Sequence, residues 1–137
     1  MTSSILLVDD DRVALYALSE VLCELPARLI LAGSGEEALR QVLKHEFAAI
    51  LLDVRLPNMD GFEVAAAIRS LGRSRRTPII FMSANEDRRK QPRRGATDER
   101  YFRKPLVPEL VRSAVAGLLA PPAPAIDLPQ VAMQDRL

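Results

Sequence analysis

The chain has 137 residues, a formal net charge of +1 and a hydrophobic content of 48%, which is the profile of one globular domain. The near-neutral charge argues against a dedicated nucleic-acid binder, and the longest apolar runs are too short to cross a membrane. No basic N-terminal segment precedes a long apolar stretch, and the only cysteine, Cys23, cannot form an internal disulfide. We therefore expect a cytoplasmic protein without membrane association.

The first part of the chain alternates short apolar runs with helical patterns. Residues 4–8 predict a buried strand, and three aspartates follow it directly. The next helix has apolar residues three and four positions apart from 13 to 25, and Pro26 ends it. A second strand is predicted over 29–32, and a second helix follows with Ser34 as its N-cap.

The run over residues 48–52 is the most informative, because it is uninterrupted and ends in the single carboxylate of Asp53. Such a run suits a strand that is buried on both faces of a parallel sheet. A turn follows, in which Pro57 fixes φ and Gly61 is the last turn residue. Asp53 is therefore expected at the carboxyl end of a buried strand, where parallel sheets place their ligands.

Two further helices and two further strands are predicted after this turn. The helices cover 62–71 and 107–119, a buried strand covers 78–82, and 100–103 is a short candidate for a fifth strand. The apolar spacing places three large residues on the buried faces of three different helices: Val13, Leu43 and Leu110.

Two segments depart from this regular pattern. The stretch 86–94 has no apolar residue and contains Pro92, so a helix there would lack a face that docks on the sheet. We expect the fourth helix to be short, distorted or mobile. Residues 121–129 contain four prolines, and 121–137 are expected to be an extended or disordered tail.

The alternation of strands and helices over residues 1–120 predicts one domain of the α/β class. Short connections between parallel strands require right-handed crossovers. The predicted fold is a doubly wound, five-stranded parallel sheet with flanking helices, of the flavodoxin-like type.

Polar groups follow or end four predicted strands: Asp9 and Asp10, Asp53, Ser83, and Lys104. The carboxyl ends of parallel strands meet at one edge, so these groups could converge there. Neighbouring carboxylates repel each other, and a hard cation such as Mg²⁺ or Mn²⁺ removes that conflict. A metal and a lysine together suit phosphoryl transfer, with an ionised aspartate as the nucleophile.

Together these motifs resemble a response-regulator receiver domain of two-component signalling, similar to the CheY-like group, over about residues 4–119. The residues that carry the resemblance are Val8-Asp9-Asp10, Leu52-Asp53 with Pro57 and Met59-Asp60-Gly61, Met82-Ser83-Ala84, and Tyr101 with Lys104-Pro105. The resemblance implies that Asp53 accepts a phosphoryl group from the phosphohistidine of a histidine kinase or phosphotransfer protein. It also implies a magnesium site formed by Asp10, Asp53 and the backbone carbonyl of Arg55, with Asp9 acting mostly through water.

The resemblance further implies how the signal leaves the site. Ser83 would donate a hydrogen bond to the phosphoryl group, and Lys104 would pair with it. Tyr101 would turn inward when Ser83 moves towards the phosphoryl group, which couples the chemistry to the surface around the fourth helix.

The favoured function is a stand-alone phosphoacceptor that switches a contact with an unknown downstream protein. It promotes only its own phosphorylation and dephosphorylation, so it is not expected to be an enzyme. No direct DNA binding is expected, because the chain has no room for a helix-turn-helix after Leu119.

Two alternatives stay open. One is a receiver-like interaction module that acts without phosphorylation. The other is a phosphatase with an aspartyl-phosphate intermediate, for which Asp9 and Asp11 offer a DxD arrangement that leaves Asp53 unexplained.

Overall fold

The computed structural model describes residues 3–84 and 99–119. Its five strands form one sheet: β1 (Ser3–Val8), β2 (Ala27–Ala32), β3 (Ala49–Asp53), β4 (Ile79–Ser83) and β5 (Glu99–Arg103). The strand order is β2-β1-β3-β4-β5, and every neighbouring pair is parallel. The chain thus winds outwards from β1 in both directions, which confirms the predicted doubly wound fold.

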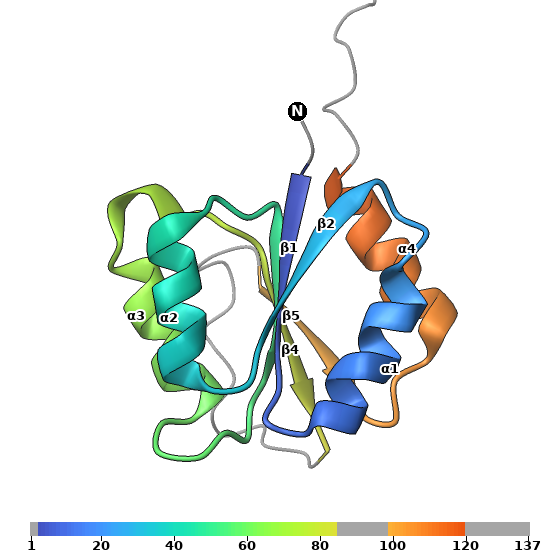
Figure 1. The fold of residues 1–137 in the computed structure, drawn as a ribbon, viewed down its shortest axis with the longest axis horizontal. Coiled ribbons are helices and arrows are strands. Elements are labelled where there is room, and N and C mark those ends of the chain that lie inside the picture. The colour runs from blue at the N-terminus through green and yellow to red at the C-terminus, as the bar shows by residue number, and fades with distance from the viewer. Residues whose placement is uncertain (1–2, 85–98, 120–137) are drawn as a thin grey trace, which may run out of the picture.

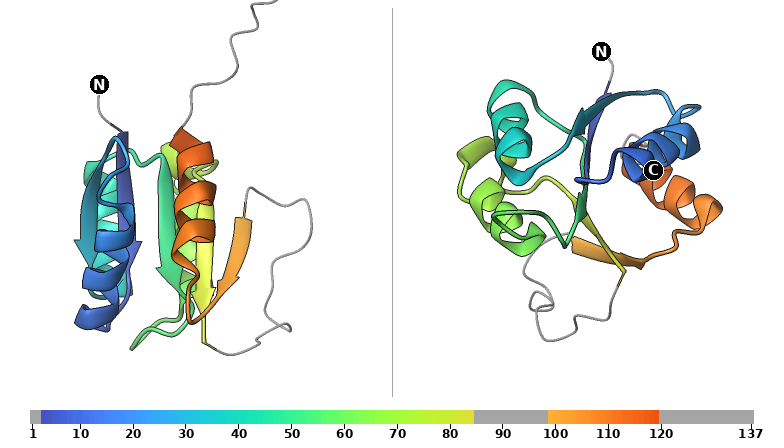
Figure 2. Two further views of the ribbon diagram at one scale, coloured as in Figure 1. Left: turned by 90° about the vertical axis from the view of Figure 1, so that its right-hand side faces the viewer. Right: turned by 60° about the horizontal axis from the view of Figure 1, so that its bottom comes forward.

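Helices cover both faces of the sheet (Figure 1). One face carries α2 (Gly35–Lys44) and α3 (Gly61–Arg69), and the other carries α1 (Arg12–Leu22) and α4 (Pro108–Leu119). A short 3₁₀ turn, η1 (Gly72–Ser74), connects α3 to β4. Figure 2 shows α1 and α4 side by side in front of the sheet, and all residues of the central strands β3 and β4 are buried.

The central strands explain why the apolar runs in the sequence are uninterrupted. All five residues of β3 and of β4 are buried. In β3, Ile50 and Leu52 join the core beneath α2 and α3, whereas Leu51 joins the core beneath α1 and α4. Each such side chain contributes about 1.5–3 kcal/mol by leaving water, so both faces require apolar residues.

The helix starts follow the expected capping chemistry. The Asp11 side chain accepts hydrogen bonds from the amides of Val13 and Ala14, at 2.9 and 3.3 Å, and thereby caps α1. The Ser34 hydroxyl accepts a hydrogen bond from the Glu37 amide at 3.1 Å and caps α2, as predicted.

Three details of the prediction are wrong. The helix α1 ends at Leu22 rather than near residue 25, and β2 begins two residues earlier than expected because its backbone pairs with β1 from Ala27 onwards. The side chains of Val13, Leu43 and Leu110 are 78%, 63% and 58% exposed. In each helix the buried residues define a narrow stripe, and these three positions lie about 100° or more from it.

The expected distortion of 86–94 and the expected tail at 121–137 both lie outside the described residues. The domain boundary at residue 120 stays a prediction.

Replacing Gly61 with alanine is expected to lower the free energy of unfolding by about 1–3 kcal/mol, the usual cost of overpacking. A Cβ atom at this position would overlap the carbonyl oxygen of Asp53 and lie 2.9 Å from the Cα of Val54. Urea unfolding measures the loss. The control is Gly72→Ala, because a Cβ there has no heavy atom within 4 Å and should change stability by less than about 0.5 kcal/mol. Equal losses in the two variants would show that the contact at Gly61 is unimportant.

Candidate functional site

The carboxyl ends of the strands lie at the lower edge of the sheet in Figure 1, and polar residues from several of these ends come together. Asp53 is the last residue of β3 and Ser83 is the last residue of β4. Asp9 directly follows β1, and Lys104 directly follows β5. Asp9 and Asp53 are 2% and 6% exposed, so two carboxylates are nearly buried within one small region.

Hydrogen bonds of the backbone extend the sheet into this region. The amide of Asp9 donates to the carbonyl of Ala32 at 3.2 Å. The amide of Val54 donates to the Met82 carbonyl at 2.9 Å, and the amide of Lys104 donates to Ser83 at 2.8 Å. The functional side chains are therefore fixed by the strand ladder rather than by a free loop.

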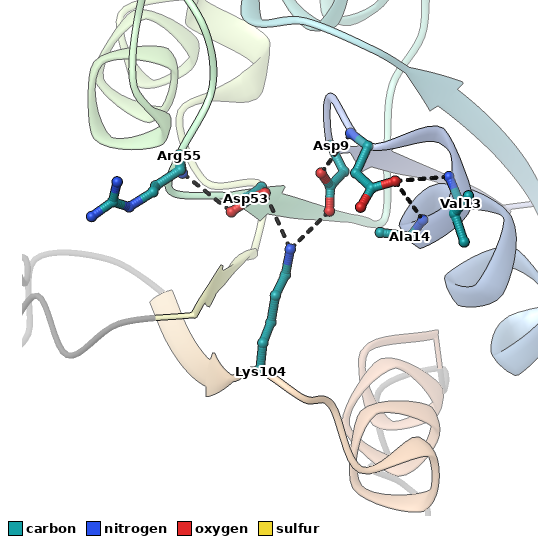
Figure 3. Close-up of polar contacts among 7 residues, drawn as sticks. Asp9, Val13, Ala14, Asp53, Arg55 and Lys104 are labelled. Carbon is teal, nitrogen blue, oxygen red and sulfur yellow. Dashed lines mark hydrogen bonds and ion pairs between the residues drawn. The ribbon is translucent and has the colours of Figure 1, made fainter.

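Lys104 lies between the two buried carboxylates (Figure 3). Its ammonium nitrogen is 2.9 Å from Oδ2 of Asp9 and 3.2 Å from Oδ2 of Asp53. The remaining oxygen of Asp53, Oδ1, accepts a hydrogen bond from the Arg55 amide at 3.1 Å. The side chain of Arg55 points away from Lys104. One cation is thus shared by two carboxylates, which leaves negative charge in the site.

The surroundings of Asp53, the candidate nucleophile, change the pKa of its carboxyl group. Burial raises the pKa of Asp53, and the charge of Asp9 adds to the increase. The Arg55 amide and the Lys104 ammonium act in the opposite direction but do not cancel it. Burial also opposes the charged form of Lys104, yet its hydrogen bond to Asp9 and the charge of Asp53 raise the pKa of that ammonium.

The three aspartates fit a divalent cation. One carboxylate oxygen from each of Asp9, Asp10 and Asp53 lies within 4.8 Å of the other two. This spacing and the all-oxygen donor set suit Mg²⁺, which would also relieve the repulsion between Asp9 and Asp53. The structure therefore brings together the carboxylates that the sequence assigned to the metal. The role of the Arg55 carbonyl stays a prediction.

Asp11 does not belong to this acidic cluster. Its carboxylate caps α1 and is exposed, and among the described residues the cluster contains only Asp9, Asp10 and Asp53. The phosphatase alternative requires Asp9 and Asp11 to act together in a DxD arrangement. In the structure Asp9 belongs to the acidic cluster, whereas Asp11 caps a helix.

Ser83 and Tyr101 lie on the same side of the sheet. Ser83 follows Phe81 by two residues, and Phe81 is the register partner of Tyr101 in β5. The Tyr101 ring stacks on Phe81, with ring centroids 5.1 Å apart, and packs against the core beneath α2 and α3. Ser83 is 9% exposed and lies beside Lys104 through the backbone hydrogen bond described above.

Sequence reasoning missed the capping box that shapes the turn after Asp53. The Asp60 side chain accepts a hydrogen bond from the Glu63 amide, and the Glu63 side chain accepts one from the Asp60 amide, both at 2.9 Å. The Gly61 amide then donates to Val54 at 2.7 Å and returns the chain to the end of β3. The sequence signal for this capping box was an aspartate, Asp60, followed three residues later by a glutamate, Glu63.

Magnesium binding is expected to weaken as the pH falls towards the raised pKa of Asp53. Protons compete with the cation for this carboxylate, and the burial that raises its pKa extends that competition to a higher pH than for an exposed aspartate. Isothermal titration over a series of pH values should show a Kd for Mg²⁺ that increases as the pH falls. An unchanged Kd would contradict a site that contains Asp53.

The raised pKa of Asp53 also makes the free energy of unfolding of the metal-free protein depend on pH. Because the folded pKa of Asp53 lies above its unfolded value, the stabilising contribution is complete at low pH and is lost as the pH rises through the folded pKa. Magnesium should reverse this loss at neutral pH, and thermal unfolding with and without the cation measures the reversal.

Comparison with known proteins agrees with the fold. The family model of the response regulator receiver domain matches residues 5–116. The chain belongs to this family, and its domain is the CheY-like receiver of two-component response regulators. Within the described residues, no helix has both the length and the apolar content that a membrane span requires.

Two curated relatives are regulators of transcription. The chain is 34% identical over 121 residues to the transcriptional regulatory protein SrrA of Staphylococcus aureus, and the match covers 87% of this chain and 48% of the relative. It is 30% identical over 122 residues to the probable transcriptional regulator ycf29 of Porphyra purpurea, with coverage of 87% and 57%. The chain thus spans about half the length of these relatives.

Several solved receiver domains have the same fold. The chemotaxis response regulator CheY4 of Vibrio cholerae is 27% identical with a TM-score of 0.76, and the match covers 86% of this chain and 99% of CheY4. The receiver domain of the sensor histidine kinase PA1611 from Pseudomonas aeruginosa is 29% identical with a TM-score of 0.76, over 87% of this chain and 98% of that domain. That structure has a magnesium ion coordinated in its active-site cleft.

Proposed function

We propose that the chain is a phosphoacceptor switch in which Asp53 receives a phosphoryl group in a magnesium-dependent reaction. The observation that carries this proposal is the shared cation: Lys104 contacts both Asp9 and Asp53 at an edge where three carboxylates converge. Such a site has one lysine and an acidic metal cluster around a nearly buried carboxylate, which is the set of groups that phosphoryl transfer needs.

The proposed reaction is an in-line displacement at phosphorus. A carboxylate oxygen of Asp53 forms the new bond to phosphorus, and the bond from phosphorus to the nitrogen of the donor's phosphohistidine breaks. The electron pair of that bond returns to the donor imidazole, which takes up a proton from solvent. Magnesium held by Asp9, Asp10, Asp53 and the Arg55 carbonyl would neutralise charge on the phosphoryl oxygens.

Other residues of the site have assigned roles in this proposal. Lys104 pairs with a phosphoryl oxygen, because its ammonium already lies within 3.2 Å of Asp53. The Ser83 hydroxyl donates a hydrogen bond to another phosphoryl oxygen, and Tyr101 is the residue whose position reports that contact. The Arg55 amide holds Oδ1 of Asp53 and so orients the carboxylate.

The proposed partners are a histidine kinase or phosphotransfer protein as donor and a downstream protein as target. The reaction modifies the chain itself, so no separate substrate is turned over. The curated relatives are regulators of transcription, but the match covers about half of each. For this domain we propose that the signal passes on through a contact with another protein rather than through direct DNA binding. We also propose a cytoplasmic location, where the kinase partner is available.

The direct test incubates the purified chain with acetyl phosphate and Mg²⁺ and measures its intact mass. We expect the mass to increase by one phosphoryl group, and chelation of the cation with EDTA should prevent the increase. Treatment with hydroxylamine should remove the added group, because acyl phosphates are reactive and serine phosphates are not. No increase with Mg²⁺ would reject phosphoacceptor function and would favour an interaction module that acts without phosphorylation.

A further inference from the structure

Positive charge is concentrated in the connection between α3 and β4. Between Glu63 and Glu86 the sequence contains four arginines and no acidic residue, although the net charge of the whole chain is only +1. The arginines lie in the last turn of α3, in η1 and directly after η1. They are Arg69, Arg73, Arg75 and Arg76. Runs of charge often belong to a solvated loop, so the role of this run depends on what each side chain contacts.

Arg69 fixes the backbone of this connection. Its side chain is half-buried, and Nη1 donates hydrogen bonds to the carbonyls of Ser74, Arg75 and Thr77. One guanidinium group that binds three carbonyls restricts the backbone over residues 74–77. The arginines that follow η1 therefore extend from a defined backbone, which lowers the entropy that a partner has to remove on binding.

Arg73 joins the connection to the end of α2. Its Nη2 donates a hydrogen bond to the carbonyl of Leu43 at 3.0 Å, and Lys44 is the last residue of α2. Figure 1 shows the end of α2 beside the connection after α3, at the upper left of the molecule. We define the basic surface as the exposed Leu43 together with four exposed cationic side chains: Lys44, Arg73, Arg75 and Arg76.

The fold itself accounts for only part of this positive charge. A cation near the C-terminus of a helix is favourable, which explains Lys44, and Arg73 satisfies a carbonyl in the last turn of α2. In the part of the chain that the structure describes, the side chains of Arg75 and Arg76 make no hydrogen bond or ion pair. Like charges that lie close together repel each other, so the basic surface is complementary to an anionic partner.

An acidic segment of a protein fits the basic surface better than a nucleic acid does. Single-stranded nucleic acids stack their bases on exposed aromatic rings. The large apolar residue of the basic surface is instead aliphatic, because Leu43 is 63% exposed there, whereas the exposed Tyr16 lies on α1 at the other face of the sheet. Protein interfaces combine an apolar centre with a polar rim, and Leu43 with its cationic neighbours offers both.

We infer that the basic surface is a docking site for an acidic segment of another protein. Carboxylates of that segment would pair with Arg75 and Arg76, and an apolar residue of the segment would cover Leu43. The basic surface lies where α2 ends and β4 begins, and Asp53 lies where β3 ends, so the two are at opposite edges of the parallel sheet. The inference is therefore independent of the proposed function, and a partner bound here would leave Asp53 open to a phosphoryl donor.

A synthetic peptide of glutamates with one central leucine tests the inference by NMR. The peptide is titrated into the ¹⁵N-labelled chain without Mg²⁺, so that the glutamates do not compete for the cation. We expect shifts of the amides at 43–46 and 72–77, whereas the amides of Asp9, Asp53 and Lys104 should keep their positions. Raising the NaCl concentration from about 50 mM to about 300 mM should increase Kd by a factor of about three or more, because salt screens exposed charges.

Two variants and a matched control separate the contributions to binding. Arg75→Gln combined with Arg76→Gln should raise Kd by about 3- to 10-fold, the effect of losing two exposed ion pairs. Leu43→Ala should raise Kd by about 3-fold or more, because an apolar contact is lost. The control combines Arg28→Gln with Arg100→Gln, which removes the same charge from exposed positions on the edge strands β2 and β5. Its Kd should change by less than about twofold, and thermal unfolding checks that all three proteins are folded.

The inference is overturned if the peptide shifts no amide of the basic surface, if Leu43→Ala leaves Kd unchanged, or if the control weakens binding as much as the loss of Arg75 and Arg76. It is also overturned if a thymidine oligonucleotide or vesicles of phosphatidylglycerol bind the basic surface more tightly than the peptide does. Those results would assign the surface to a nucleic acid or to a membrane. Phosphoryl uptake is measured in none of these experiments, so a failure here leaves the proposed function unaffected.

Discussion

Replacing Asp53 with asparagine is expected to abolish phosphoryl uptake from acetyl phosphate and to stabilise the metal-free fold. Asparagine has no anionic oxygen that can attack phosphorus, so the mass increase should disappear completely. The substitution also removes a nearly buried charge whose pKa is raised by burial and by the charge of Asp9. The amide oxygen can still accept the hydrogen bond from Arg55.

The expected gain in unfolding free energy at neutral pH without magnesium is about 1–2 kcal/mol, the scale of a like-charge contact relieved in a partly hydrated site. The loss of one of the two contacts of Lys104 limits this gain. Intact-mass measurement and urea unfolding of the same preparation test both effects. Asp11→Asn is the matched control, because this carboxylate only caps α1 and asparagine caps a helix equally well. Phosphoryl uptake that persists in Asp53→Asn would assign the acceptor to another residue.

The second large effect is expected from Asp10→Asn, which should weaken Mg²⁺ binding at least tenfold. Asp10 contributes one of three clustered carboxylate oxygens, and a hard cation depends on the charge of its ligands. Asp10 is exposed, so its replacement should change the stability of the metal-free protein by less than about 0.5 kcal/mol. The two measurements together isolate a role in metal binding from a role in folding.

Isothermal titration of Mg²⁺ into wild type, Asp10→Asn and Asp11→Asn checks this expectation. The neighbouring aspartates carry the same charge, yet only Asp10 belongs to the cluster, whereas Asp11 faces the amides of α1. Asp11→Asn should therefore bind Mg²⁺ with an affinity close to that of wild type. Equal losses in both variants would mean that the cation responds to general negative charge rather than to a defined ligand set.

Most of the fold could be predicted from the chain because its central strands are buried on both faces. The runs at 48–52 and 78–82 leave no polar face, so they require helices on both sides of the sheet. The edge strand β2 was harder to delimit, because Ala27 and Arg28 belong to it through backbone pairing with β1 rather than through an apolar pattern. Three apolar residues that were predicted to be buried are exposed, because apolar character alone does not set the direction of a side chain on a helix. They are Val13, Leu43 and Leu110.

The acidic site was predictable for a related reason. The residues that follow parallel strands share one edge, so Asp9, Asp53 and Lys104 could be grouped before any distance was known. The sharing of one ammonium by two carboxylates could not be predicted, because it depends on distances of 2.9 and 3.2 Å between residues that are 95 and 51 positions apart in the sequence. The ring contacts of Phe62 with Phe81 and Tyr101 could not be predicted either, because they depend on how α3 packs on the sheet.

The backbone ladder that continues past the strands also determines how the site responds to thermal fluctuation. The amides of Asp9, Val54 and Lys104 all donate to carbonyls of neighbouring strands or strand ends. Such amides exchange with deuterium mainly when the sheet itself opens, and local fraying of a loop does not release them. We expect their exchange to follow the slow core amides of β3 and β4. The arrangement of charges around Asp53 would then persist as long as the domain stays folded.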